Sequence, residues 1–402
     1  MSWKLQTRKW WHFFKTHLGQ GLPAAYRYGH PADQLHIYGI TGTDGKTTSS
    51  TLLYHVLKTA GRKVALISTV AAFIGDEEID TGFHVTSPNP AALQRLLRRC
   101  VDAGVEDVVL EVTSHGLYQY RVAGVKFDLA GITNVTREHL DYFETWEKLV
   151  KVKGTLLAQA KQAMLNQDDE SFALLRRQLR AVQTPYKTYS QRLLPGSVGK
   201  AIGKRFSEAY NQWNANLVWS MAQELGVDKK TFVQAIESFP GVKGRMESIP
   251  NKRGLNIIVD FAHTPNGLEQ VLSALREETG SKQQLIAVYG TAGLRDRSKR
   301  PQMGEIGSRI ADLAIFTAED PRTEDLQVIL RQMKEGVKSP NHRKVVTIAD
   351  RKEAIAFALK HAKKGDTIGV FGKGHEKSMC FGTVEQPWSD QEAVAKLLAT
   401  KE

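Results

Sequence analysis

The sequence has few cysteines and no long apolar run. Only Cys100 and Cys380 occur among its 402 residues, and neither belongs to a metal-binding spacing. Two cysteines so far apart favour buried thiols over a disulfide framework, which predicts a protein of the reducing cytoplasm. No stretch has the character of a signal peptide or a membrane-spanning helix. Because zinc spacings and RNP-like motifs are also missing, nucleic acid is not an expected partner.

The composition is that of a globular protein with a basic surplus. Hydrophobic residues make up 41% of the chain and charged residues 24%, which is enough for two or three domains with real cores. The net charge is +12, from 55 basic and 43 acidic side chains. Such a balance suits an anionic membrane surface or polyanionic small substrates.

The first twenty residues combine aromatic and basic side chains. Trp10, Phe14 and Leu18 recur at helical spacing, with lysines and arginines beside them. A helix of this kind can lie on an anionic membrane, which would place the protein peripherally at the inner membrane face. It can equally dock on the body of the protein, and the sequence leaves both alternatives open.

A glycine-punctuated loop at residues 39–48, GITGTDGKTT, is the most informative segment. An apolar run precedes it and a helix-like stretch follows, an order in which backbone N–H groups and a helix N-terminus surround a phosphate. Lys46 is expected to reach the terminal phosphates and the Thr47 hydroxyl to meet Mg²⁺. Ile40 stands where the common P-loop pattern has its first glycine. The predicted nucleotide-binding residues here are Gly42, Thr43, Asp44, Gly45, Lys46, Thr47 and Thr48.

Alternating apolar and helical stretches predict an α/β fold with two domains after a basic aromatic helical segment at residues 1–38. Residues 39–240 are expected to form a P-loop domain with a mostly parallel sheet, and residues 241–402 a Rossmann-like α/β domain. Prolines and glycines at 183–204 predict a loop or a pair of weak strands. Strands of the second domain are expected at 256–260, 285–289, 313–317, 345–347 and 367–371.

Polar residues follow the apolar runs of the first domain. Glu111 comes directly after the expected strand at 108–110, and His139 lies shortly after a second apolar run. A carboxylate and an imidazole at strand ends suit a Mg²⁺ site beside a triphosphate. Taken alone, His115 and His139 are equally consistent with helix-capping or core histidines.

Taken together, these segments resemble the Mur ligase family, most closely its UDP-N-acetylmuramoyl-tripeptide synthetase branch. The resemblance extends from about residue 35 to the C-terminus. It rests on GTDGKTT at 42–48, TSP at 86–88, EVTSHGL at 111–117, TNVTREHLDYF at 133–143, NQWNANL at 211–217, GRME at 244–247, DFAHTPNGL at 260–268, RDRSKRPQMGE at 295–305, EDPR at 319–322 and GKGHE at 372–376.

The resemblance implies an ATP-dependent ligase that joins an amino acid to a peptide or muramoyl-peptide carboxylate through an acyl phosphate. ATP and one or two Mg²⁺ ions are the implied cofactors, and residues 39–240 and 241–402 become the central and C-terminal Mur ligase domains. Lys153 matches a lysine that is carbamylated in the family, which turns a cation into an anion; an ordinary surface lysine is the alternative. The implied catalytic residues are Lys46, Glu111, His139 and Lys153, and the implied metal site is Thr47, Glu111, His139 and Lys153.

Further positions follow from the same resemblance. Asn214 or Asn216 would contact adenine, while Arg245 and Asp260 would close on the γ-phosphate and ribose. Because these residues lie far from the phosphate loop in sequence, the resemblance implies a domain closure that excludes water from the acyl phosphate.

The incoming amino acid is expected to be meso-diaminopimelate or a related diamino acid. Arg322 resembles the arginine of a DNPR motif, whose guanidinium fork grips the distal carboxylate, with a structural ion pair as the alternative. Glu376 could pair with the distal ammonium. The implied amino-acid site is Arg295, Asp320, Arg322 and Glu376, and the implied acceptor site is Ser87, Ser114 and Arg121.

Three departures from the family pattern concern the substrates. The family's uridine-nucleotide domain is not found before the phosphate loop, and the stretch 166–211 is shorter than in the family. In the substrate region, Glu319-Asp320 replaces Asp-Asn and the residues at 291–294 replace Cys-Gly-Gly-Asp. One rival hypothesis is a catalytically silent nucleotide-binding scaffold at the membrane, against which the intact catalytic positions argue. A P-loop kinase is a second rival, but it leaves the motifs of the second domain unexplained.

Overall fold

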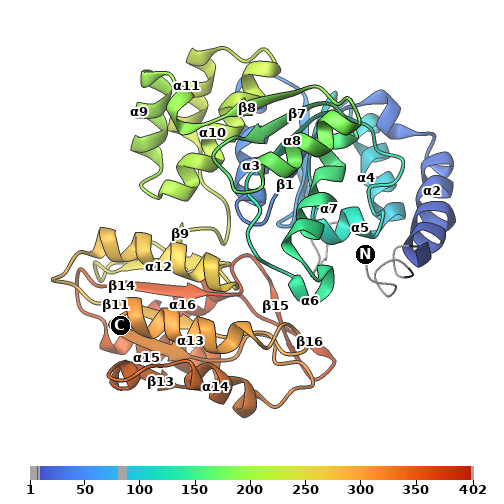
Figure 1. Cartoon of the computed structure of the whole chain (residues 1–402). Coiled ribbons are helices and arrows are strands. Elements are labelled where there is room, and N and C mark those ends of the chain that lie inside the picture. The colour runs from blue at the N-terminus through green and yellow to red at the C-terminus, as the bar shows by residue number, and fades with distance from the viewer. Residues whose placement is uncertain (1–6, 8–9, 80–87, 400–402) are drawn as a thin grey trace. The chain divides into compact units, whose positions relative to one another are not determined.

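The chain divides into two compact units, Met1–Pro240 and Gly241–Glu402, in a computed structural model that describes residues 7, 10–79 and 88–399 (Figure 1). Each unit contains its own mainly parallel sheet with helices packed on it. None of the helices within the described part of the chain has the length and apolar character needed to cross a membrane.

The first unit is built on an eight-stranded sheet with the strand order β4-β3-β2-β5-β1-β6-β7-β8. The six strands from β2 to β8 in this order are parallel, whereas β3 and β4 form an antiparallel edge. The strands are β1 (His36–Thr41), β2 (Val64–Ile67), β3 (Ala72–Ile74), β4 (Glu77–Ile79), β5 (Asp107–Glu111), β6 (Phe127–Ile132), β7 (Ala160–Asn166) and β8 (Tyr186–Tyr189).

Helices cover both faces of this sheet. Alternate residues of the central strands, such as Ile37 and Val108, share one core with α4, α7 and α8, and the intervening residues face α3 and α10. Strands buried on both faces explain the nearly continuous apolar runs in the sequence. The helices are α3 (Lys46–Thr59), α4 (Pro90–Asp102), α5 (Ser114–Tyr118), α6 (Leu140–Phe143), α7 (Trp146–Ala158), α8 (Phe172–Ala181), α9 (Gly196–Arg205), α10 (Ala209–Glu224) and α11 (Lys229–Ser238), with a short η3 (Gln191–Leu193).

The segment 183–204 differs from its prediction. It contains one strand, β8, and most of the helix α9, rather than a loop or a pair of strands. The helix forms because Val198, Ala201 and Ile202 lie on one face and are buried as α9 packs against α11. Its three glycines lie where an added Cβ would meet open space, so packing on the other face outweighs their low helix propensity.

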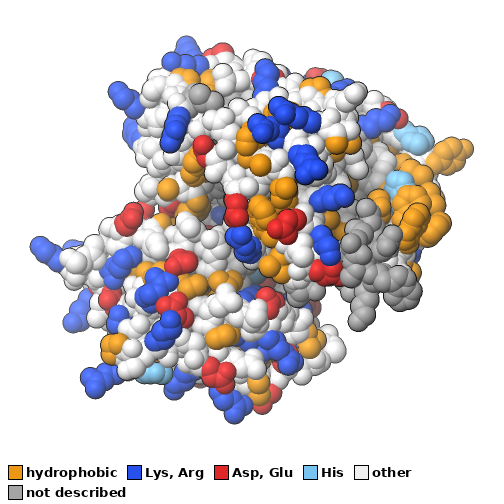
Figure 2. All heavy atoms as spheres, in the orientation of Figure 1, with side chains coloured by type: hydrophobic (Ala, Val, Ile, Leu, Met, Phe, Trp, Pro, Cys, Tyr) orange, Lys and Arg blue, Asp and Glu red, His pale blue; other side chains and the backbone are white. Residues whose placement is uncertain are grey.

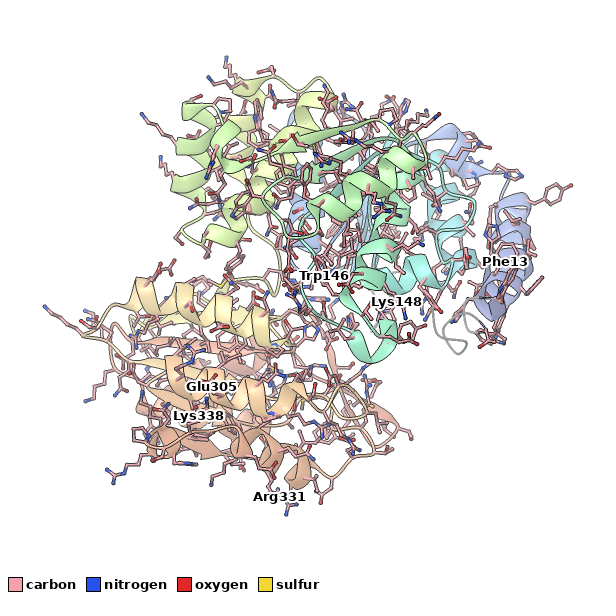
Figure 3. The ribbon with its side chains drawn as sticks, in the orientation of Figure 1. Phe13, Trp146, Lys148, Glu305, Arg331 and Lys338 are labelled. Carbon is pink, nitrogen blue, oxygen red and sulfur yellow. The ribbon has the colours of Figure 1, made fainter. Side chains whose placement is uncertain are left out.

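The described part of the N-terminal segment is helical. It consists of the π-helical η1 (Phe13–Gly21), which continues into α2 (Leu22–Arg27), followed by a short 3₁₀ turn, η2 (Pro31–Gln34). Both η1 and α2 pack against α4, and Figure 3 labels Phe13 on this helix. The helix therefore docks on the first unit through one of its faces.

The second unit is a six-stranded sheet with the order β13-β12-β11-β14-β10-β9, parallel except for β9, and a separate β15–β16 hairpin. Its strands are β9 (Glu247–Ser248), β10 (Asn256–Asp260), β11 (Leu285–Tyr289), β12 (Leu313–Phe316), β13 (Val345–Thr347), β14 (Thr367–Phe371), β15 (Ser378–Phe381) and β16 (Val384–Pro387). Its helices are α12 (Pro265–Thr279), α13 (Lys299–Ile310), α14 (Leu326–Glu335), α15 (Arg351–His361) and α16 (Asp390–Ala399), with a short η4 (Asn341–Lys344). The predicted α/β class, with a mostly parallel sheet and a second α/β domain, is confirmed.

Candidate functional site

The phosphate loop connects β1 to α3 and requires glycine at two positions. Gly42 has φ 149° and Gly45 has φ 79°, both unfavourable for residues with a side chain. A Cβ on Gly42 would lie 1.8 Å from Thr133 Oγ1, and one on Gly45 would lie 2.0 Å from Asn214 Oδ1. The loop is therefore packed directly against the end of β6 and against α10.

Residues after β6 fix the shape of the loop. The Thr43 N–H donates to Asn134 O at 2.9 Å, and the Asp44 N–H donates to Asn134 Oδ1 at 3.1 Å. Lys46 Nζ donates to Thr43 O at 2.7 Å, so the ammonium folds back over its own loop. The first amides of α3 have no partner within the helix and are the groups that can receive an anion.

Glu111 and Thr47 meet at the carboxyl end of the sheet. The Thr47 hydroxyl donates to Glu111 Oε1 at 3.0 Å, while Thr69 donates to the same carboxylate through its hydroxyl at 2.9 Å and its N–H at 3.0 Å. Glu111 is 1% exposed. A hydroxyl and a carboxylate are hard oxygen donors, so this pair fits Mg²⁺.

Lys153 lies on the other side of the loop, in α7. The helix begins at the Thr145 cap, and the Trp146 indole donates to Val135 O at 2.9 Å, which ties α7 to the segment after β6 (Figure 3). Lys153 is 3% exposed, and its ammonium donates to Gly42 O. Burial, together with the nearby charge of Lys46, lowers the pKa of Lys153 to about 7. The alternative of a surface lysine is wrong for this position.

Two histidines meet edge to face near the same sheet edge. The His115 and His139 rings have centroids 4.8 Å apart, and His139 Nε2 lies 3.0 Å from Glu138 Oε1. His139 adopts a left-handed conformation with φ 54°. Burial and the neighbouring His139 lower the pKa of His115 to about 3, so His115 is neutral at pH 7.

No cluster of three or more His, Cys, Asp or Glu side chains suited to a metal is found in the described residues. His139 contacts His115 and Glu138, and Thr47 pairs with Glu111. A carbamate on Lys153 would add a further anionic oxygen donor, which lysine itself cannot supply.

A cavity of about 240 Å³ opens between the ends of β6, β7 and β8 and the helix α10. Asn214 lines it and also touches Gly45, so the cavity adjoins the phosphate loop. Asn216 is buried, and its Nδ2 has no hydrogen-bond partner among the described residues. Of the two predicted adenine contacts, Asn214 is the one that faces this cavity. Its lining is Thr133, Asn134, Asn166, Asp168, Asp169, Tyr189, Tyr210, Trp213 and Asn214.

Several of these lining residues were not predicted from the sequence. Tyr210 and Trp213 precede Asn214 on α10 at helical spacing, and Asp168 and Asp169 follow β7 directly. The signals that could have found them are the aromatic residues beside and inside the NQWNANL motif and the acidic residues just past a parallel strand.

The predicted acceptor residues lie at and after α5. Ser114 is buried at the start of this helix, and Arg121 Nε donates to Gln119 Oε1 at 2.9 Å. Ser87 falls outside the described residues.

In the second unit, the GRME, DFAH and GKGHE motifs come together. The Arg245 guanidinium stacks 4.4 Å from the Phe261 ring centroid, and the His375 ring lies 5.1 Å from the same ring. Asp260 accepts the N–H groups of Met246 and Ala262, each at 2.7 Å. Asp260 therefore orders the two turns that carry these motifs.

The predicted amino-acid site contains a buried charge network. Lys373 Nζ donates to Asp320 Oδ1 at 2.8 Å and also pairs with Glu376. Burial alone would lower the pKa of Lys373, but the two carboxylates outweigh it and the pKa is raised. Sequence reasoning did not assign a role to Lys373, although the GKGHE motif contains it.

Arg322 and Glu319 flank this network on the same turn. Arg322 has φ 53°, its N–H donates to Cys380 O at 3.0 Å, and its guanidinium lies 3.5 Å from Gly293 O. Burial raises the pKa of Glu319 to about 7, and its Oε2 has no hydrogen-bond partner among the described residues. Arg295 is exposed in the loop after β11.

Comparison with known proteins matches residues 40–207 to the Mur ligase middle domain and residues 244–374 to the Mur ligase glutamate ligase domain. The UDP-N-acetylmuramoyl-L-alanyl-D-glutamate–2,6-diaminopimelate ligase of Clostridium botulinum is 37% identical over 390 residues, which cover 92% of this chain and 79% of that protein. The protein of the same name from Parabacteroides distasonis is 35% identical, over 95% of this chain and 82% of that protein.

Solved structures give the same result. A UDP-N-acetylmuramoyl-L-alanyl-D-glutamate–2,6-diaminopimelate ligase superposes with a TM-score of 0.58 at 29% identity, covering 91% of this chain and 79% of that one. A pseudomurein peptide ligase type C from Methanothermus fervidus shares the fold, with a TM-score of 0.63 at 18% identity over 92% of this chain and 79% of that one. With the phosphate loop, the Thr47–Glu111 pair and both domain matches in place, the chain belongs to the Mur ligase family of ATP-dependent ligases.

Proposed function

We propose that the protein adds meso-diaminopimelate, or a related diamino acid, to the carboxylate of a muramoyl-peptide-like acceptor by way of an acyl phosphate. The observation that carries this proposal is the convergence of Lys46, Glu111 and Lys153 on one phosphate loop. The second unit supports it with a turn that carries Arg322 beside a buried network of opposite charges. The two relatives named above are, by their names, ligases of 2,6-diaminopimelate, which is the same class of reaction.

Each catalytic residue has a role that its surroundings support. Lys46 can leave Thr43 O and neutralise the charge that develops on the transferred phosphoryl group. Thr47 and Glu111 would hold Mg²⁺, which supplies Lewis-acid stabilisation of the phosphate oxygens. The cavity beside Asn214, with Trp213 and Tyr210 in its wall, fits a flat purine ring next to the phosphate loop.

Lys153 is proposed to carry a carbamate. Only a neutral amine reacts with CO₂, and a pKa near 7 leaves a large neutral fraction at physiological pH. The ammonium first loses one proton to solvent; the neutral nitrogen then forms a bond to the carbon of CO₂ and releases a second proton, so that one buried cation becomes one anion. That anion would lie close to Lys46, whose charge favours it.

The amino-acid site favours a substrate with a distal carboxylate and ammonium. Arg322 offers a planar fork for a carboxylate, and Glu319 and Glu376 offer acidic groups for an ammonium. Asp320 stands where the family motif has an amide, and its carboxylate pairs with the Lys373 ammonium. The charge of Lys373 is therefore balanced by a residue of the protein and needs no substrate group to neutralise it.

An assay of ADP release across a panel of amino acids tests the proposed function. With a muramoyl-dipeptide acceptor, turnover is expected to require both substrates and to be fastest with meso-diaminopimelate. Arg322→Ala is expected to raise the KM for that amino acid roughly 10-fold to 100-fold, as expected when a charged bidentate contact is lost. Free lysine, which lacks the distal carboxylate, serves as the control substrate. The KM for lysine should be the same in Arg322→Ala as in the wild type. ATP turnover that needs no amino acid, or no turnover with any, would refute the ligase proposal.

We further propose that the exposed face of the N-terminal helix contacts an anionic membrane. The side chains of Trp10, Phe14 and Leu18 are 56%, 60% and 42% exposed although the helix is docked, and Figure 2 shows hydrophobic side chains gathered there. The first thirty residues contain basic side chains and no Asp or Glu. Exposed aromatic groups in a segment with basic and no acidic side chains suit an anionic lipid surface.

Sedimentation with lipid vesicles tests this contact. The protein is expected to bind vesicles containing phosphatidylglycerol and to lose most binding when Trp10, Phe14 and Leu18 are changed together to serine. Val182→Ser, at an exposed apolar residue 54% accessible elsewhere on the first unit, is the matched control. Equal binding by the triple variant and the wild type would contradict membrane contact through this helix.

A further inference from the structure

The N-terminal helix also forms one wall of a second cavity, of about 340 Å³. This cavity lies on a different side of the helix from Trp10, Phe14 and Leu18, which are not among its lining residues. The helix contributes Trp11, Lys15 and Gln20, and the body of the first unit contributes Asn89, Gln119 and Arg121.

Packing holds this wall in position. The Phe13 and His17 rings lie 5.6 Å and 5.4 Å from the Tyr120 ring centroid. Gly21 is buried so closely that an added Cβ would lie 2.4 Å from the Ala123 Cβ. The helix therefore packs against Tyr120 and Ala123, on either side of Arg121 in the chain, so both walls of the cavity are held by packing.

The charge of the cavity selects an anion. Lys15 and Arg121 face it from opposite sides, and none of the described residues that line it carries a carboxylate. Lys15 Nζ lies 4.4 Å from the Trp11 ring centroid, which holds the ammonium near the cavity mouth. Gln119 orients Arg121 through the bond between Oε1 and Nε. Two cations facing one cavity attract a negatively charged ligand.

The cavity is connected to the phosphate loop by a short stretch of chain. Glu111 ends β5, α5 follows from Ser114, and Arg121 comes soon after it. Within this stretch His115 contacts His139 beside the nucleotide site. An acceptor whose reacting carboxylate lies near the phosphate loop can thus extend along α5 into the cavity.

We propose that this cavity binds an anionic group of the acceptor, a phosphate or a carboxylate remote from the one that reacts. Trp11 and Lys15 are then residues that determine acceptor specificity, and residues 10–21 are part of the substrate site. This inference rests on the ligase function proposed above and names where its acceptor is recognised.

Calorimetric titration of the full chain tests the inference with two probes. One is UDP-N-acetylmuramoyl-L-alanyl-D-glutamate, and the other is the same muramoyl dipeptide without the nucleotide. Lys15→Glu, which replaces the cation by an anion, and Trp11→Ala, which removes the ring that holds the Lys15 ammonium, are expected to weaken binding roughly 10-fold or more. Lys58→Glu and Trp10→Ala are the matched controls at exposed positions outside the cavity. Melting curves confirm that each variant is folded.

Each outcome has a distinct meaning. Weaker binding of the nucleotide probe alone identifies a phosphate as the anion, and weaker binding of both probes identifies a carboxylate of the peptide. Unchanged dissociation constants for both Lys15→Glu and Trp11→Ala would overturn the inference while leaving the ligase proposal intact. Failure of the wild type to bind either probe would instead refute the proposed acceptor.

Discussion

Replacing Lys153 by methionine is expected to abolish turnover while making the protein more stable. Turnover should fall by about 10³-fold or more, equivalent to about 4 kcal/mol of transition-state stabilisation, because no carbamate can form. In CO₂-free buffer, where Lys153 carries no carbamate, stability should rise because methionine fills the same space without a buried ammonium. Opposite effects on activity and stability are characteristic of a functional residue in an unfavourable environment.

The stability effect should depend on pH in a defined direction. The folded pKa of Lys153 is about 7, whereas an unfolded lysine titrates near 10.4. Between these values the unfolded chain binds more protons, so the stability of the wild type rises with pH in this window. Below pH 7 both states are protonated, and the full cost of burying the ammonium remains. The advantage of Lys153→Met in melting temperature is therefore expected to be largest near pH 6.5 and to shrink towards pH 10.

Lys151→Met is the matched control, because Lys151 is exposed on the same helix. It should change neither turnover nor the pH dependence of the melting temperature. Carbon-13 NMR after incubation with labelled bicarbonate should show a carbamate resonance in the wild type that is absent from Lys153→Met. Normal turnover by Lys153→Met would show that this lysine has no part in the reaction.

Much of the fold was predictable because local patterns and burial agree. The strands β10, β11, β13 and β14 begin and end where apolar runs predicted them. For β10, β11 and β14 the reason is that strands covered on both faces need such runs. The loop at 42–48 was predictable for a similar reason, because its glycines serve a backbone shape that no other residue adopts easily. In these cases the sequence near a residue determines its structure.

The remainder depends on contacts between residues far apart in sequence. The α9 helix contains three glycines and forms only because α11 covers its apolar face. The Asp320–Lys373 pair joins residues 53 positions apart, so neither motif alone indicated it. The cavity between Lys15 and Arg121 likewise exists only once the first helix packs beside Tyr120. Such features require the tertiary structure.

Replacing Glu111 by glutamine is expected to lower turnover by about 10² to 10³-fold, or about 3 to 4 kcal/mol. The carboxylate accepts hydrogen bonds from the Thr47 hydroxyl and from two groups of Thr69. An amide of the same size keeps the packing but loses the negative charge that Mg²⁺ requires. Its NH₂ group must also face a donor, which should reduce stability by about 1 to 3 kcal/mol.

The diagnostic measurement is turnover as a function of Mg²⁺ concentration. If Glu111 holds the ion, Glu111→Gln should need substantially more Mg²⁺ for half-maximal rate, and raising the concentration should restore part of the activity. Glu106→Gln, at an exposed residue just before β5, should follow the wild-type curve. A loss of turnover with an unchanged Mg²⁺ requirement would instead mean that Glu111 acts by positioning Thr47 and Thr69. The Mg²⁺ dependence thus separates a metal ligand from a structural hydrogen-bond acceptor. Both roles predict slower turnover, but only a metal ligand predicts weaker binding of Mg²⁺.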